Sequence, residues 1–231
     1  MKLSARIAGA LFLLLSFLEV NFLSFGFVVV HRIVKPFLMP SLALSALLAL
    51  LPEHRGRETT LLAIGMTFHF AGDVFLLYDG MAFIWFVCGL AAFQIGHFFY
   101  LAVLYSGMGR LQGWKEILCL VLPVFITPFA VLLFDVSGGI RIALSVYTMT
   151  LLTVTSTGVL WLLRGRKQGW RIIICGLLFM FSDALIGFNT FSGFDFPLRH
   201  ALVLATYLAA EWFLVSGMVF YRIHSSTPQA R

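Results

Sequence analysis

The sequence is 231 residues long, with 61% hydrophobic residues, 11% charged residues and a formal net charge of +6 at pH 7. This composition excludes a soluble globular domain and is typical of a polytopic membrane protein. The basic residues form no aromatic-interleaved patch of the kind that binds nucleic acid, so we expect no nucleic-acid partner.

Eight apolar segments are each long enough to cross about 30 Å of hydrocarbon as a helix. A single segment in hydrocarbon is expected to be helical, because a helix forms its backbone hydrogen bonds within the segment. The predicted spans are 5–25, 35–51, 60–78, 81–105, 115–134, 140–163, 171–191 and 198–221. The first begins like a secretory signal but lacks a small-residue cleavage site, so we interpret it as a membrane span. The expected fold is an all-α bundle of about eight transmembrane helices, forming a single domain over residues 1–231.

The distribution of basic residues predicts the orientation. If both termini are cytoplasmic, twelve of the sixteen Lys and Arg residues lie on the inner side. The four on the outer side are Arg32, Lys35, Arg141 and Arg199. This bias follows the positive-inside rule, so we expect an integral membrane protein with cytoplasmic termini that contacts the lipid bilayer and its anionic headgroups.

Two charged residues lie near the outer ends of the first two predicted spans. Glu19 lies about a turn and a half from the end of the first span. Lys35 opens the second span, and Pro36 suits the first turn of a helix because its missing N–H is not needed there. Each residue either anchors a helix end at the interface or lies at the outer mouth of the bundle.

The third span carries an ionisable pair, His69 and Asp73, on the same helix face as Gly65 and Gly72. A charged Asp at the centre of a bilayer costs roughly 2.5–3.5 kcal/mol, so this face is expected to point into the protein. The glycines allow another backbone to approach closely. The pair either belongs to a working site or makes a single interhelical hydrogen bond.

The fourth span places His97 and Tyr100 beside Gln94 and two glycines, Gly89 and Gly96. A straight-helix estimate puts His97 about 24 Å from the outer surface, too deep for a compact site with Asp73. A tilted helix, a later start of the span or a separate role for His97 would each account for this depth.

Two later spans also carry embedded polar residues. The seventh contains Asp183 in its outer half and Asn189 nearer its outer end, and the eighth contains Glu211 near its middle. Two embedded aspartates at comparable depth, Asp73 and Asp183, are difficult to explain as interfacial anchors. They predict a shared function.

Cys88, Cys119 and Cys175 lie within spans and lack metal-ligand spacing, so we interpret them as buried thiols. The sequence contains no Gly-rich phosphate loop, nucleophile elbow or metal triad. We therefore predict no metal and no cofactor. No feature of the sequence indicates an oligomeric state.

The order and spacing of these residues across the spans resemble the YhhN family of membrane proteins, whose characterised members are lysoplasmalogenases. Thr190 departs from the pattern, because a basic residue is often expected there in the family. The resemblance rests on Lys35-Pro36, Gly72-Asp73, the series Gly89, Phe93, His97 and Tyr100, and Ser182-Asp183 followed by Asn189 and Phe191.

The resemblance implies a hydrolase that cleaves the vinyl-ether bond of a lysoplasmalogen, giving a fatty aldehyde and a glycerophospho-ethanolamine or -choline. The reaction begins with protonation of the β-carbon, and water then captures the resulting oxocarbenium ion. These steps require one protonated carboxyl and one carboxylate, as in glycoside hydrolysis. Asp73 and Asp183 are then the catalytic pair, and a lysophospholipid is the expected partner. The expected substrate-binding or orienting residues are Lys35, His69, His97, Tyr100, Asn189, Glu211 and Glu19.

Three alternatives remain open at this point. A related ether or ester lysolipid is an alternative substrate. A proton-coupled transporter also uses embedded Asp, Glu and His as relay groups. A non-catalytic lipid-binding protein uses the same residues only to bond its helices together.

Overall fold

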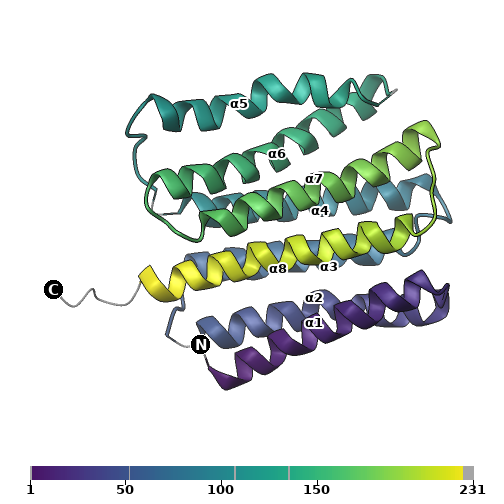
Figure 1. Cartoon of the computed structure of the whole chain (residues 1–231), viewed down its shortest axis with the longest axis horizontal. Coiled ribbons are helices and arrows are strands. Elements are labelled where there is room, and N and C mark those ends of the chain that lie inside the picture. Colours follow the sequence, from purple (N-terminus) through teal and green to yellow (C-terminus); the bar gives the residue numbers. More distant parts are fainter. Residues whose placement is uncertain (1, 52, 107, 135, 226–231) are drawn as a thin grey trace. The chain divides into compact units, whose positions relative to one another are not determined.

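The computed structural model describes residues 2–51, 53–106, 108–134 and 136–225. Within these ranges it contains eight α-helices and no strand. The helices are α1 Leu3–Ser24, α2 Val28–Leu50, α3 Arg57–Leu76, α4 Phe83–Tyr105, α5 Trp114–Val131, α6 Gly138–Leu163, α7 Gly169–Ser192 and α8 Arg199–Ser225 (Figure 1). All eight are long and apolar enough to cross a membrane. The prediction of an all-α protein with about eight transmembrane helices is confirmed.

The second helix begins seven residues before the predicted span, at Val28 instead of residue 35. The turn before it is short because Gly26 adopts a left-handed conformation with φ of +79°. His31, Arg32 and Lys35 therefore lie within α2, and Pro36 lies inside the helix and not in its first turn. Membrane helices tolerate an internal proline when nearby groups satisfy the freed carbonyls, so the expectation for Pro36 is corrected.

The chain divides into two compact units, which we describe separately. Unit 1 comprises residues 1–106 and 218–231, and unit 2 comprises residues 107–217. The α8 helix contributes to both. A single transmembrane domain stays a prediction.

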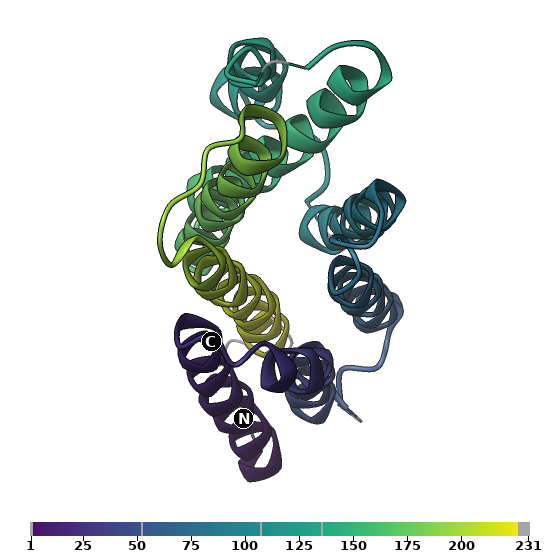
Figure 2. The same ribbon diagram turned by 90° about the vertical axis from the view of Figure 1, so that its right-hand side faces the viewer.

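In unit 1, α1 packs against α2, α2 against α3, and α3 against α4. Figure 2 shows these purple-to-blue helices following one another in chain order. In unit 2, α5 packs against α6 and α6 against α7. The α7 and α8 helices are joined by a hydrogen bond of 3.0 Å from the Ser182 hydroxyl to the Val203 carbonyl.

Glycines set the close approach of α3 and α4. A Cβ atom at Gly65 would lie 2.7 Å from the Tyr100 ring, and one at Gly72 would lie 2.8 Å from the Phe93 ring. At Gly96 it would lie 2.2 Å from the His69 ring. Because none of these positions has room for a side chain, the four-residue turns of the two helices interlock in one register.

Candidate functional site

One enclosed charge pair in unit 1 joins Lys35 on α2 to Asp73 on α3. The Lys35 Nζ atom lies 3.9 Å from Asp73 Oδ1, and the two side chains are 12% and 4% exposed. Both residues were singled out from separate predicted spans, and the packing of α2 against α3 brings them together. The attraction between an ammonium and a carboxylate is stronger this far from water than at the surface.

A second pair lies between α1 and α2. Glu19 is fully buried, and its Oε1 atom lies 2.5 Å from Nδ1 of His31. His31 lies before the second predicted span, which opens at residue 35, and it was not predicted as a site residue. The signal that identifies it is its spacing of four residues from Lys35, which puts both side chains on one face of α2.

His69, His97 and Tyr100 form one buried aromatic cluster between α3 and α4. The His69 ring centroid lies 4.6 Å from that of His97 and 4.7 Å from that of Tyr100. His97 Nδ1 donates a hydrogen bond of 2.8 Å to the carbonyl of Phe93. All three side chains are at most 1% exposed.

The register between α3 and α4 determines which residues of α3 lie at the same level as His97. Gly65 lies opposite Gly96 and Tyr100, and Gly72 lies opposite Phe93, so His97 is level with His69. His69 precedes Asp73 by one helical turn, about 6 Å of rise. The straight-helix estimate counted each helix from its own end and did not include the register between them, which places His97 beside His69. A site that includes both His97 and Asp73 stays a prediction.

In unit 2, Asp183 on α7 accepts a hydrogen bond of 2.9 Å from the Tyr147 hydroxyl on α6. Glu211 on α8 is fully buried and lies within electrostatic range of Tyr147. Tyr147 was not predicted as a site residue. A tyrosine within a membrane span was the available signal, because a buried phenol usually has a hydrogen-bond partner.

The hydrogen bond of the Asn189 side chain is made to the joint after α7 and not to Tyr147 or Asp183. Its side-chain amide donates a hydrogen bond of 3.2 Å to the Phe194 carbonyl, in the joint that follows α7. That joint opens at Gly193, whose φ of +64° ends the helix. The Asn189 side chain thus stabilises the turn, and its expected role in orienting substrate stays a prediction.

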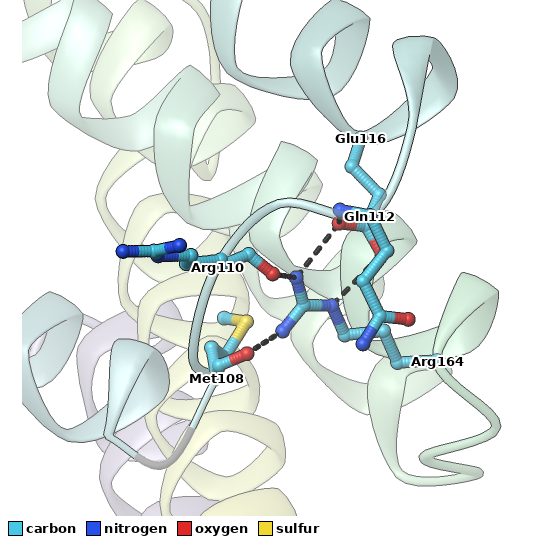
Figure 3. Close-up of polar contacts among 5 residues, drawn as sticks. All are labelled: Met108, Arg110, Gln112, Glu116 and Arg164. Carbon is cyan, nitrogen blue, oxygen red and sulfur yellow. Dashed lines mark hydrogen bonds and ion pairs between the residues drawn. The ribbon is translucent and has the colours of Figure 1, made fainter.

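A further polar cluster in unit 2 surrounds Arg164, at the end of α6 (Figure 3). Its Nε and Nη2 atoms donate hydrogen bonds of 2.9 and 2.7 Å to the two carboxylate oxygens of Glu116 on α5. The same guanidinium donates to the carbonyls of Met108 and Arg110. Hydrogen bonding to Glu116 raises the pKa of Arg164 above its ordinary value, so the guanidinium is positively charged in this cluster.

The cluster ties the segment before α5 to the end of α6, and each of the three guanidinium nitrogens of Arg164 donates to an acceptor in unit 2. We therefore assign it a structural role. Among the described residues, no group of three or more His, Cys, Asp or Glu side chains is arranged to hold a metal ion. Chemistry without a metal or cofactor stays a prediction.

The sequence profile of the YhhN family matches residues 30–218 of this chain. Lysoplasmalogenase TMEM86B of Rattus norvegicus is 29% identical over 159 residues, which are 69% of this chain and 61% of that protein. The Mus musculus protein of the same name is 28% identical over 160 residues, 69% of this chain and 64% of that protein. The Sus scrofa protein of that name is 33% identical over 128 residues, 54% of this chain and 50% of that protein.

This chain therefore matches less than two thirds of the length of these relatives. No solved structure matches it. The family match extends from α2 to α8 and includes Lys35, Asp73, Asp183 and Glu211. Because it covers most of the sequence, the chain belongs to the YhhN family.

Proposed function

We propose that this protein is an integral membrane hydrolase that cleaves the vinyl-ether bond of a lysoplasmalogen to a fatty aldehyde and a glycerophospho-base. Membership of the YhhN family and similarity to proteins named lysoplasmalogenase support the reaction class. The observation that carries the proposal is that each of two aspartates in membrane spans lies beside a defined polar partner. Asp73 meets Lys35, and Asp183 meets Tyr147.

The reaction needs one acid and one base. A carboxyl group transfers its proton to the β-carbon of the vinyl ether, and the C=C electron pair forms the new C–H bond. Water then adds to the oxygen-stabilised α-carbon and loses a proton to the carboxylate. The resulting hemiacetal breaks its bond to the glycerol oxygen, which takes up a proton as the aldehyde forms, so one water is consumed and no proton is gained or lost.

The partners of the two aspartates suggest how the roles divide. Asp73 lies 3.9 Å from an ammonium, which stabilises a carboxylate, so we assign it the base role. Asp183 accepts a hydrogen bond from the neutral Tyr147 hydroxyl through Oδ2, so its other oxygen is assigned the acidic proton. His69, one turn from Asp73, and its neighbour His97 are assigned to positioning water or the carboxylate.

The test is release of fatty aldehyde from lysoplasmenyl-ethanolamine by the detergent-purified protein, with and without a chelator. Asp73→Asn and Asp183→Asn are each expected to lower kcat by at least about a hundredfold, the usual contribution of a general acid or base. Asp79→Asn is the matched control, because Asp79 is exposed in the turn after α3. Full activity in either site variant, or none in folded wild-type protein, would contradict the proposal.

A proton-coupled transporter is the second candidate, and the observation that favours it is the buried contact between the rings of His69 and His97. Two adjacent imidazoles within membrane spans are suited to passing a proton. Proton flux into liposomes that contain the purified protein separates the two functions. A hydrolase releases aldehyde without flux, whereas a transporter moves protons without releasing aldehyde.

A further inference from the structure

The face of α2 that carries Lys35 also carries His31, one turn closer to the start of the helix. The His31 side chain is 16% exposed and that of Lys35 is 12% exposed, so each is largely enclosed and still reaches the surface. By helix rise the two residues lie about 5 and 11 Å from the start of α2. Both residues therefore lie within the first two turns of α2, at the end of the helix that is predicted to face the outer surface.

Glu19 fixes the orientation of the His31 ring. Its Oε1 atom lies 2.5 Å from His31 Nδ1, so Nε2 is on the side of the ring away from α1. A carboxylate on one ring nitrogen determines which way the other nitrogen faces. In its protonated form the ring donates from both nitrogens, one to Glu19 and the other to a ligand.

The second oxygen of Glu19 provides an independent indication of a ligand. Glu19 is 0% exposed, and its Oε2 atom has no hydrogen-bond partner among the described residues. Buried carboxylate oxygens are rarely left without a donor, and an exception commonly marks a place for water or a bound molecule. A lysophospholipid headgroup brings both an anion and N–H or O–H donors.

We propose that His31 and Lys35 together bind the phosphate of the lysophospholipid, with Glu19 as the residue that positions His31. This subsite rests on the proposed function, from which the substrate class is taken. Phosphate oxygens are bound most strongly by charged donors at fixed positions. Glu19 lies outside the part of the chain that the family profile matches, which begins at residue 30.

The subsite is tested by binding, so that the result does not depend on turnover. The ligands are two uncleavable saturated ethers, 1-alkyl-glycerophosphoethanolamine and 1-alkylglycerol, which differ only by the phospho-base. The ratio of their dissociation constants with the purified full-length protein is the phosphate preference. His31→Gln is expected to lower this preference about tenfold, as for loss of one charge-assisted hydrogen bond. His31→Lys is expected to restore it towards the wild-type ratio.

Arg32→Gln is the matched control, because Arg32 is a basic residue next to His31 in the sequence and its side chain is exposed, so it supplies general surface charge without being enclosed. It is expected to change the preference by no more than about twofold, as for a surface charge. Glu19→Gln, which keeps an acceptor for His31, is expected to give an intermediate loss. Should His31→Gln fail to fold, Lys35→Gln provides the same measurement.

An unchanged phosphate preference in His31→Gln or Lys35→Gln would overturn the subsite, even if the wild-type protein releases aldehyde. An equal loss in Arg32→Gln would overturn it as well, because general surface charge would then explain the binding. A tenfold loss confined to the subsite variants, in a protein that cleaves no vinyl ether, would keep the subsite and reject the proposed reaction.

Discussion

Tyr147 tests the acid role proposed for Asp183 most directly, through one hydrogen bond. Its hydroxyl donates to Asp183 at 2.9 Å, and Glu211 lies within electrostatic range. Tyr147→Phe keeps the ring and removes only this donor, so we expect kcat/KM for aldehyde release to fall about tenfold. The melting temperature of the purified protein reports any change in folding.

Tyr78→Phe is the control for this substitution, since Tyr78 is 46% exposed and its ring contact with Trp85 is kept by phenylalanine. Wild-type activity in Tyr147→Phe would show that Asp183 works without its hydroxyl partner. The assignment of the acid role to Asp183 would then lose the contact on which it rests.

At the scale of elements, the pair formed by α3 and α4 determines where His69 lies. A Cβ atom at Gly96 would lie 2.2 Å from the His69 ring and 3.0 Å from the Gly65 carbonyl. Gly96→Ala therefore has to displace the ring or separate the helices. Overpacking of this kind costs typically 1–3 kcal/mol of unfolding free energy, so we expect a lower melting temperature together with reduced aldehyde release.

Gly80→Ala is the matched control, because no atom outside its chain neighbours lies within 4 Å of the Cβ position there. It is expected to leave both the melting temperature and aldehyde release at the wild-type level. If Gly96→Ala behaved like Gly80→Ala, the two helices would not need the close contact, and the assigned position of His69 would lose its support.

At the scale of the whole molecule, the distribution of basic residues predicts cytoplasmic termini. Alkaline phosphatase fused after Arg231 is expected to be inactive, because this enzyme needs the oxidising compartment outside the cytoplasm. The same enzyme inserted in the joint between α3 and α4 is expected to be active. The reverse pattern would show that the protein has the opposite orientation and would place Lys35 and Asp73 nearer the cytoplasmic surface.

The sequence alone determined the class of the protein, the number of membrane helices and the identity of most charged residues in the candidate site. These features can be recognised in each span by itself. A span needs about 20 apolar residues to cross the hydrocarbon, and an embedded charge is costly however the helices pack. Lys35, Asp73 and Asp183 were identifiable for this reason. The ends of seven helices lie within four residues of the predicted spans.

Only the tertiary structure decided which residues are partners. His31 and Tyr147 were recognised through their contacts with Glu19 and Asp183, and His97 was placed beside His69 by the register of α3 and α4. The tertiary structure also showed where α2 begins. A turn at Gly26 lets the helix start at Val28, so that it includes His31. Rotation and register between helices depend on contacts made across the bundle, especially at glycines, and the hydrophobic pattern of a single span does not encode them.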